Sequence, residues 1–199
     1  MPRLFTGIEV PPETGLMLGA FRGGLPGARW VEPSDYHVTL RFIGDVDGGM
    51  AEEIAAALAE ARPRPPLTLA LDGLASFGGE RPHALFARVV PDPDLSELQA
   101  EHERILRQLG AAPDTRRFTP HVTLARLKRG AGPDGVAQYL TMQPVFPRLT
   151  FTARRVALYS ARDSVGGGPY VVEAAYPLDD DVDQRDLDQQ DLDQRDLDQ

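Results

Sequence analysis

The sequence predicts an α+β fold in which largely antiparallel strands from two pseudo-symmetric halves line a central cleft, with helices outside. The first observation is a repeated tetrapeptide, because His-Val-Thr-Leu occurs at residues 37–40 and again at residues 121–124. With average residue usage, a chance repeat after a histidine arises on the order of once in several hundred cases, which favours a duplicated half. The second observation is that strand-like and helix-like segments are mixed without strict βαβ alternation.

Each predicted strand shows period-two alternation or a short apolar run between turn residues. The predicted strands are 3–10, 36–43, 67–74, 84–90, 121–127, 155–160 and 170–176. The first predicted helix begins at Pro11 and has Leu16, Met17 and Ala20 on its apolar face. A glycine pair at 48–49 is expected to break the chain before the second helix. The other predicted helices are 50–61 and 95–109.

The composition is that of a globular protein with a core of ordinary size. The 199 residues are 42% hydrophobic and include no cysteine, which excludes disulfides, thiolate nucleophiles and cysteine metal sites. No apolar run is long enough to span a membrane, and the first residues lack the regions of a signal peptide. We therefore expect a cytoplasmic protein that needs no obligate protein partner.

The last 21 residues differ in composition from the rest of the chain. Residues 179–199 contain ten Asp and two Arg in a five-residue repeat, so they account for −8 of the net charge of −9. Such a repeat has too few apolar residues to offset the entropy of ordering. The sequence predicts a domain of two similar halves over residues 1–178 and a disordered acidic tail over residues 179–199.

The repeated tetrapeptides place the same side chains on one face of a strand. Because successive side chains of a strand point to opposite faces, His37, Thr39 and Arg41 are expected to share a face. The second copy repeats this pattern with His121 and Thr123. If the halves are related by an approximate two-fold axis, both faces line one cleft.

Two imidazoles and two hydroxyls suit displacement at the phosphorus of a phosphodiester. An imidazole with a pKa near 6.5 acts as base or acid near neutral pH, and in-line displacement needs a base on water and an acid on the leaving oxygen. The threonine hydroxyls can donate hydrogen bonds to the non-bridging oxygens. We expect neither a metal nor a cofactor, since no cluster of Asp, Glu and His at ligand spacing is visible.

Further segments accompany the two tetrapeptides. They are Arg3-Leu4-Phe5, Arg29-Trp30-Val31, Leu40-Arg41-Phe42-Ile43-Gly44, the segment 118–126 and Val156-Ala157-Leu158-Tyr159-Ser160. With these segments, residues 3–178 resemble the 2H phosphoesterase superfamily, particularly the RNA 2′,3′-cyclic phosphodiesterases once named bacterial 2′-5′ RNA ligases. The resemblance implies a 2H (LigT-like) fold and an RNA or nucleotide substrate with a 2′,3′-cyclic phosphate. It implies that His37 protonates the leaving 3′ oxygen and that His121 accepts a proton from water, giving a 2′-phosphomonoester.

Two arginines are candidate substrate-binding residues. Arg41 shares the face of the first histidine by alternation, although a solvated surface position is an equal alternative. Arg126 matches the family pattern, yet by simple alternation it points away from the second histidine unless the strand bulges. Trp30 and Phe42 are expected in the core, with base stacking as the alternative. The remaining histidines are expected to be bystanders: His83 and His102.

Three alternative functions stay open beside hydrolysis. Ligation of RNA ends through a 2′-5′ linkage shares its transition state with hydrolysis, so the motifs do not separate the two reactions. A non-catalytic RNA-binding module has the same fold, but binding alone would tolerate loss of the histidines and threonines. A metal-dependent phosphoesterase is distinguished by treatment with a chelator.

Overall fold

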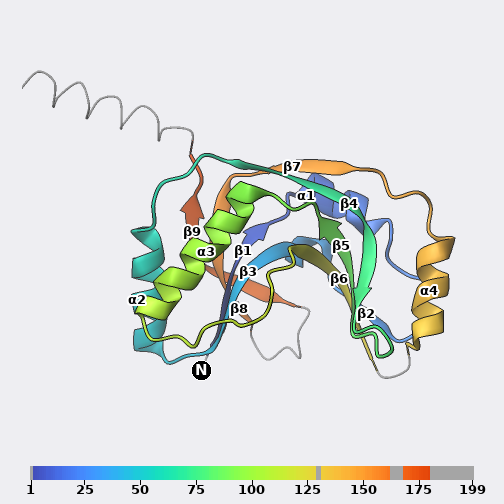
Figure 1. Cartoon of the computed structure of the whole chain (residues 1–199), viewed down its shortest axis with the longest axis horizontal. Coiled ribbons are helices and arrows are strands. Elements are labelled where there is room, and N and C mark those ends of the chain that lie inside the picture. Colours follow the sequence, from blue (N-terminus) through green and yellow to red (C-terminus); the bar gives the residue numbers. More distant parts are fainter. Residues whose placement is uncertain (1, 129–130, 162–167, 180–199) are drawn as a thin grey trace, which may run out of the picture.

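The residues that the computed structural model describes, 2–128, 131–161 and 168–179, fold around one nine-stranded antiparallel sheet (Figure 1). Its strands are β1 (Arg3–Glu9), β2 (Ala28–Trp30), β3 (His37–Asp45), β4 (Leu67–Phe77), β5 (Ala84–Val89), β6 (His121–Leu127), β7 (Leu149–Ala153), β8 (Arg155–Ala161) and β9 (Tyr170–Pro177). The helices are α1 (Pro12–Gly19), α2 (Gly48–Ala59), α3 (Pro93–Gln108) and α4 (Pro133–Met142), with a short 3-10 turn, η1 (Pro33–Asp35). The predicted α+β class with antiparallel pairing is confirmed.

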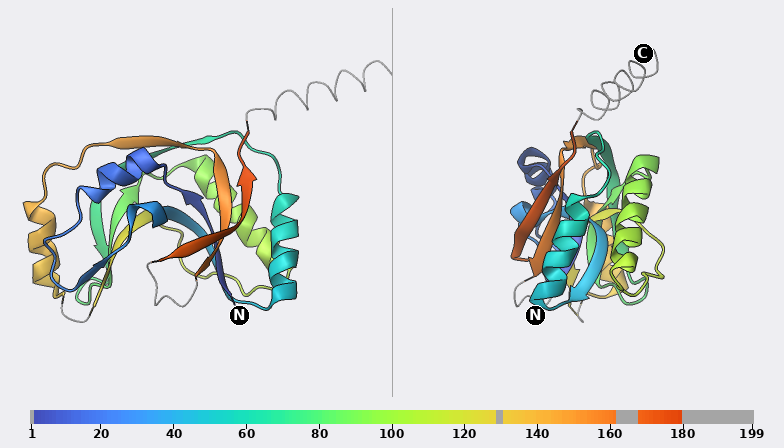
Figure 2. Two further views of the ribbon diagram at one scale, coloured as in Figure 1. Left: turned by 180° about the vertical axis from the view of Figure 1, so that it is seen from behind. Right: turned by 90° about the vertical axis from the view of Figure 1, so that its left-hand side faces the viewer.

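The sheet has two groups of strands, β3-β1-β8-β9 and β7-β4-β5-β6 with β2, that meet at the strands carrying the repeated tetrapeptides. The strand order is β7-β4-β5-β6-β3-β1-β8-β9, and β2 pairs with β6. The register between β3 and β6 is a single bridge, Val38 opposite Val122. In Figures 1 and 2 the sheet curves into an arch, with α2 at the outer side of one arm and α4 at the outer side of the other. The fold therefore brings two segments that are far apart in sequence side by side at the middle of the arch.

The helices α2, α3 and α4 pack on one face of the sheet. In the first arm, α2 and α3 form a buried cluster with β1 and β8 through Leu4, Ile54, Leu58, Leu106 and Leu158. In the second arm, α4 packs on β5 and β6 through Leu85, Ala125, Val136 and Tyr139. These sheet residues alternate with those that surround the two histidines. The histidines therefore lie on the opposite face of the sheet from these helices.

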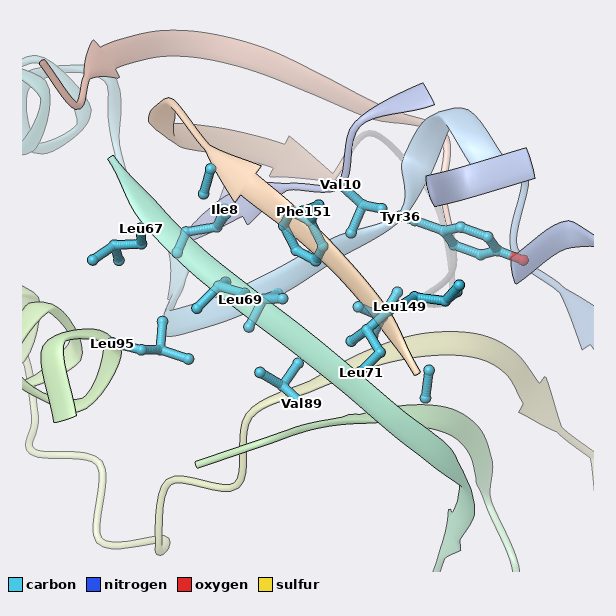
Figure 3. Close-up of a cluster of buried hydrophobic side chains, with 14 of the residues drawn as sticks. Ile8, Val10, Tyr36, Leu67, Leu69, Leu71, Val89, Leu95, Leu149 and Phe151 are labelled. Atoms are coloured by element: carbon cyan, nitrogen blue, oxygen red, sulfur yellow. The ribbon is translucent and has the colours of Figure 1, made fainter. Parts of the chain in front are cut away.

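The largest buried cluster lies under the middle of the sheet, and Figure 3 shows part of it around β4 and β7. The aliphatic residues of both tetrapeptides belong to this cluster and are at most 3% exposed: Val38, Leu40, Val122 and Leu124. This confirms the prediction that each tetrapeptide buries its aliphatic row. Burying that row fixes which way the histidine and threonine of each tetrapeptide point.

The expected apolar face of α1 is wrong. Its buried residues are Thr14, Gly15 and Leu18, whereas Leu16 is 72% exposed and Met17 is 53% exposed. The helix packs against η1 so closely that a Cβ on the buried glycine would lie 3.1 Å from a backbone oxygen of that turn. Close approach to η1, rather than the hydrophobicity of the helix, selects the buried face.

The glycine pair that was expected to break the chain instead forms the first turn of α2. Asp47 precedes it, and its carboxylate accepts a hydrogen bond from the Met50 backbone N–H at 2.9 Å. This N-cap satisfies a donor that the helix leaves unpaired. Strands β2 and β7 and helix α4 are not predicted from the sequence, because each is short and has weak periodicity.

The division into a domain over 1–178 and a tail over 179–199 stays a prediction. Residues 180–199 lie outside the described residues. Within the described ranges, no helix has both the length and the apolar character needed to cross a membrane.

Candidate active site

The first tetrapeptide contains a β-bulge at its leucine. Thr39 and Arg41 pair with consecutive residues of β1, so Leu40 is an extra residue in the ladder. A bulge of one residue reverses the alternation of side chains beyond it. Arg41 therefore points toward the helices, and Phe42 shares the face of His37. The expected position of Arg41 beside the histidine is wrong for this reason.

The second tetrapeptide has its bulge at the same position. Thr123 and Ala125 pair with consecutive residues of β5, which makes Leu124 the extra residue. Beyond this bulge Arg126 comes onto the face of His121, and its charge acts on both histidines. Simple alternation points Arg126 away from His121 because it takes no account of the bulge. The alternative of a bulged strand is the one that the structure shows.

We call the surface formed by these side chains the histidine face. Its members from β3 and β6 are His37, Thr39, Phe42, His121, Thr123 and Arg126. The antiparallel register around the bridge between β3 and β6 places each histidine opposite the threonine of the other tetrapeptide. Opposite Cβ atoms in such a pair are about 5 Å apart. The structure thus brings together the four residues that the sequence predicts as catalytic.

Each imidazole is anchored by the carbonyl two residues before it. His37 Nδ1 lies 2.8 Å from the Asp35 carbonyl oxygen, and His121 Nδ1 lies 2.7 Å from the Thr119 carbonyl oxygen. A carbonyl only accepts, so in each ring Nδ1 carries the proton and donates it. Nε2 is then the unprotonated nitrogen of each neutral ring, and it is the atom available to a substrate.

Aromatic rings surround both histidines. The His37 ring centroid lies 4.8 Å from that of Phe5, 5.4 Å from Tyr159 and 5.1 Å from Tyr170. A Cβ at position 7 of β1 would lie 3.6 Å from His37 Cδ2 and 2.9 Å from a backbone oxygen of β3. The absence of a side chain at this position therefore lets β1 and the ring of Tyr159 pack closely on the imidazole of His37.

The second histidine has a similar but smaller aromatic surround. The His121 centroid lies 4.8 Å from that of Phe77 and 5.2 Å from that of Phe86. Sequence reasoning did not identify any of these rings as part of the site. Alternation along its strand points each of these rings to the histidine face. Which side of a strand forms that face can be told only when the pairing of the strands is known.

Burial keeps both imidazoles neutral in the free protein. The pKa of His37 falls to about 4, chiefly through burial, while the Asp35 carbonyl opposes the fall and the charges of His121 and Arg126 add to it. Burial also lowers the pKa of His121, and the charge of Arg126 contributes. Near pH 7 both rings are therefore neutral bases, with lone pairs on Nε2.

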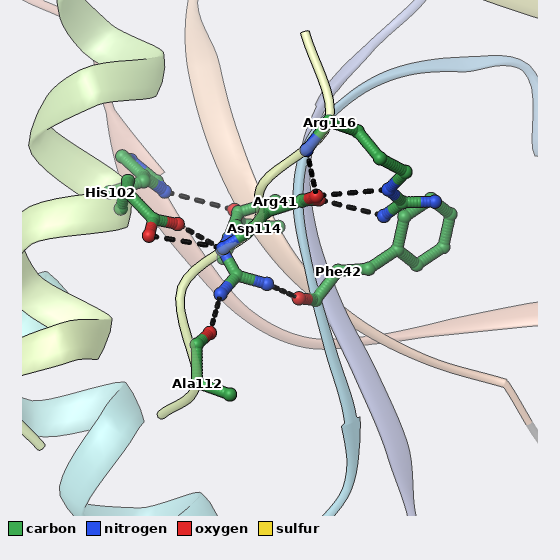
Figure 4. Close-up of polar contacts among 8 residues, drawn as sticks. Arg41, Phe42, His102, Ala112, Asp114 and Arg116 are labelled. Atoms are coloured by element: carbon green, nitrogen blue, oxygen red, sulfur yellow. Dashed lines mark hydrogen bonds and ion pairs between the residues drawn. The ribbon is translucent and has the colours of Figure 1, made fainter. Parts of the chain in front are cut away.

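Arg41 connects three parts of the structure on the helix side of the sheet (Figure 4). The side chain is 7% exposed, and its guanidinium forms an ion pair with Glu103 of α3 and donates hydrogen bonds to the carbonyl oxygens of Phe42 and Ala112. Glu103 also accepts a hydrogen bond from the Asp114 backbone N–H at 3.2 Å. This network fixes the loop after α3 against β3, and the side chain has no access to the histidine face.

The loop after α3 delivers a second arginine to the histidine face. Arg116 donates to the Asp114 carboxylate at 2.7 Å and holds the pKa of that carboxyl at about 2. Its guanidinium carbon lies 6.0 Å from the centre of the Phe42 ring, as Figure 4 shows. Phe42 is 41% exposed, so the expectation that it lies in the core is wrong. Together Phe42 and Arg116 form an exposed surface with an aromatic ring and a positive charge near His37.

The other singled-out residues lie on the helix side of the sheet or, in the case of His83, beside one of the rings that surround the second histidine. Trp30 packs against two buried clusters, which confirms its expected core position. His102 is 3% exposed, and its Nδ1 lies 3.0 Å from Thr6 Oγ1 on the helix side of β1. His83 is exposed beside the ring of Phe77. Among the described residues, no group of three or more His, Cys, Asp or Glu side chains is arranged to hold a metal ion.

Comparison with known proteins matches residues 13–164 to the 2′-5′ RNA ligase superfamily. A protein of Geobacillus stearothermophilus named RNA 2′,3′-cyclic phosphodiesterase is 36% identical over 135 residues, which are 65% of this chain and 43% of that protein. One of the same name from Aeropyrum pernix is 39% identical over 53% of this chain and 60% of its own length. The chain thus matches about half the length of these two relatives. A third, from Bacillus subtilis, is 27% identical over 79% of this chain and 87% of the relative.

Solved structures share the fold at lower sequence identity. E. coli LigT complexed with 3′-AMP matches with a TM-score of 0.70 and 21% identity, over 89% of this chain and 99% of that chain. The protein TT0787 of Thermus thermophilus matches with a TM-score of 0.70 and 23% identity, over 88% of this chain and 97% of that chain. With the family match covering most of its length and both tetrapeptides on one face of this sheet, the chain belongs to the 2′-5′ RNA ligase superfamily of 2H phosphoesterases.

Proposed function

We propose that this protein hydrolyses RNA 2′,3′-cyclic phosphates to 2′-phosphomonoesters by two-histidine acid–base catalysis. The observation that carries the proposal is the pair of anchored imidazoles, each with Nε2 available and each opposite the threonine of the other tetrapeptide. The relatives named RNA 2′,3′-cyclic phosphodiesterase support the substrate class.

The proposed reaction is an in-line displacement by water. His121 Nε2 takes a proton from water as the water oxygen bonds to phosphorus, and the bond from phosphorus to O3′ breaks. His37 Nε2 delivers a proton to O3′, which leaves as a hydroxyl, while the phosphate stays on O2′. His121 is then protonated and His37 neutral, and exchange with solvent restores the starting state.

The low pKa of His37 is compatible with its role as the acid. In the free protein the ring is neutral, but an anionic phosphate beside it favours the protonated form. Once protonated, an imidazole of low intrinsic pKa gives up its proton readily to the leaving oxygen. Thr39 and Thr123 would donate hydrogen bonds to the non-bridging oxygens, and Arg126 would balance the charge that develops there.

The asymmetry of the histidine face indicates how the substrate is oriented. Phe42 and Arg126 occupy the same offset from their histidines, five residues on, in the two copies. An exposed aromatic ring suits stacking on a base, whereas a guanidinium suits a phosphate. The terminal base is therefore assigned to the side of Phe42 and the phosphate to the side of Arg126.

The decisive experiment is to incubate the purified protein with an RNA that ends in a 2′,3′-cyclic phosphate and to map the product. A 2′-phosphate is the expected product, and EDTA should leave the rate unchanged because the two imidazoles supply both proton transfers. A 3′-phosphate would contradict the assignment of the leaving oxygen. Joined RNA with a 2′-5′ linkage would show the reverse reaction, and a rate lost with EDTA and restored by a divalent ion would show metal dependence.

A further inference from the structure

Arg29 lies directly beside Arg126 on the sheet. Strand β2 pairs with β6 in register, with Arg29 opposite Arg126 and Trp30 opposite Ala125. Opposite residues of an antiparallel pair point to the same face, with Cβ atoms about 5 Å apart. Trp30 and Ala125 point into the cluster on the helix side. Arg29 and Arg126 consequently both point to the histidine face.

These two arginines have buried nitrogen atoms without acceptors. Arg29 Nη2 and Arg126 Nε are buried and have no hydrogen-bond partner. Among the described residues, the ion pairs of the protein involve other arginines, and neither of these two has a carboxylate partner. A buried donor left without an acceptor costs roughly 1–3 kcal/mol, and two neighbouring positive charges repel each other. An anion between or beside them removes both penalties.

The position of Arg29 distinguishes its anion from the reacting phosphate. Arg126 pairs with Ala84 on β5, two residues from Phe86, which pairs with Thr123. At about 3.3 Å per residue, the row of the two arginines lies roughly 7 Å along the sheet from the row of that threonine. Arg126 is the nearer of the two to His121 along the sheet, because Arg126 and His121 both lie on β6. Arg29 is carried by the next strand, beside Arg126.

The chemistry of the substrate limits what this second anion is. An RNA that ends in a 2′,3′-cyclic phosphate has no phosphate beyond that end, so its next phosphate is the diester on the 5′ side of the terminal nucleotide. We propose that Arg29 binds this 5′ phosphodiester and so gives the site a preference for oligonucleotides over nucleoside 2′,3′-cyclic phosphates. This inference rests on the proposed function and deepens it. Arg29 acts on the second phosphate and touches none of the reacting atoms, so it is a positioning residue.

The test compares adenosine 2′,3′-cyclic phosphate with the dinucleotide ApA that ends in a 2′,3′-cyclic phosphate, which carries in addition the 5′ phosphodiester and the adenosine beyond it. The wild-type protein should show the higher kcat/KM with the dinucleotide. Arg29→Gln should lower the ratio of the two kcat/KM values about tenfold, the scale of one lost charge-assisted hydrogen bond. Arg29→Lys should keep part of the ratio, because a point charge remains while the planar fork is lost.

Salt dependence gives a second readout that a merely structural role would not move. For the dinucleotide, kcat/KM should fall less steeply with rising salt in Arg29→Gln than in the wild type, because one attraction between a guanidinium and a phosphate, which salt screens, is lost. The matched control is Arg107→Gln, on the exposed side of α3, which should leave both the ratio and the salt dependence unchanged. Melting temperatures of all variants report whether the fold is retained.

Each result decides between the two claims. Equal kcat/KM for both substrates in the wild type, or an equal loss on both in Arg29→Gln, would overturn the role of Arg29 and leave the proposed function standing. If the wild-type protein hydrolysed neither substrate, both the role of Arg29 and the proposed function would be overturned.

Discussion

The two histidines have the same local anchor but different surroundings. Each Nδ1 donates to the carbonyl two residues earlier, so the tetrapeptides set the same tautomer in both copies. Around His37 the rings of Phe5, Tyr159 and Tyr170 pack closely, and the pKa falls to about 4. Identical motifs thus give unequal imidazoles, and the difference comes from neighbouring strands.

Replacing either histidine by alanine tests this pair directly. His37→Ala and His121→Ala should each lower kcat by at least about 100-fold, the usual scale for a general acid or base. The double variant should be little slower than either single variant, because the two groups act as a unit. Steady-state kinetics on RNA with a 2′,3′-cyclic phosphate measure this, and near wild-type turnover in either single variant would rule out the mechanism.

A substrate with a good leaving group in place of the 3′ oxygen separates the two roles. The acid matters less for such a substrate, so His37→Ala should recover much of its loss, while His121→Ala should not. Recovery by His121→Ala instead would reverse the two assignments and leave the two-histidine mechanism intact.

The pH dependence of kcat/KM follows from the lowered pKa values. Two unperturbed imidazoles would place the maximum of a bell-shaped profile near pH 6.5. Because burial lowers the pKa of both rings, to about 4 for His37, both limbs should move to lower pH and the maximum should lie below 6.5. The limbs belong to the pair, since neighbouring imidazoles titrate together. Rates measured from pH 4 to 9, with folding checked at each pH, test this, and a maximum above pH 7 would contradict it.

At the scale of the elements, the bulges at Leu40 and Leu124 decide which side chains reach the histidine face. Alternation along a strand predicts correctly that His37 shares its face with Thr39, because no bulge lies between them. Beyond Leu40 alternation fails, because it assigns Arg41 to the histidine face and Phe42 to the opposite face, and the structure has the reverse. A bulge depends on how a strand pairs with its neighbours, and one strand's own residues do not reveal it. The fold class and the placement of both histidines and both threonines on one face could therefore be predicted from the sequence, whereas the residues around them could not.

Arg41 provides a test of this exchanged orientation. In Arg41→Met the partly buried carboxylate of Glu103 loses its ion-pair partner. The free energy of unfolding should therefore fall by about 3 kcal/mol. Denaturant unfolding measures the loss. At a temperature where the variant stays folded, kcat/KM should stay within a few-fold of wild type, because the guanidinium does not face the substrate. A large loss of kcat/KM with unchanged stability would instead restore Arg41 as a substrate-binding residue.

At the scale of the whole molecule, stability should depend on pH through the buried His102. Its pKa is lowered to about 4, first by burial and then by the charge of Arg64, with Glu101 opposing. An unfolded imidazole titrates near pH 6.5, so between these values the unfolded chain binds a proton that the folded chain does not. The stabilising contribution is therefore present above pH 6.5 and is lost as the pH falls toward 4.

Urea unfolding at pH 7.5 and pH 5 measures this contribution. His102→Gln should flatten the pH dependence by on the order of 2 kcal/mol between these conditions, because an amide can still bond to Thr6 but does not titrate. His83→Gln is the matched control, since that side chain is exposed. An unchanged pH dependence in His102→Gln would show that other groups control acid stability.

The single bridge between Val38 and Val122 has a consequence for how the site is assembled. Neither group of strands holds both histidines, because each contributes one histidine and one threonine, and each histidine lies opposite the threonine of the other group. A shorter chain with only one such group would complete the same constellation by pairing edge to edge with a second copy of itself. Such an isologous contact repeats every interaction twice. Because one chain carries both tetrapeptides, the second residue after each bulge can differ between the two groups, and Phe42 and Arg126 are the residues found there.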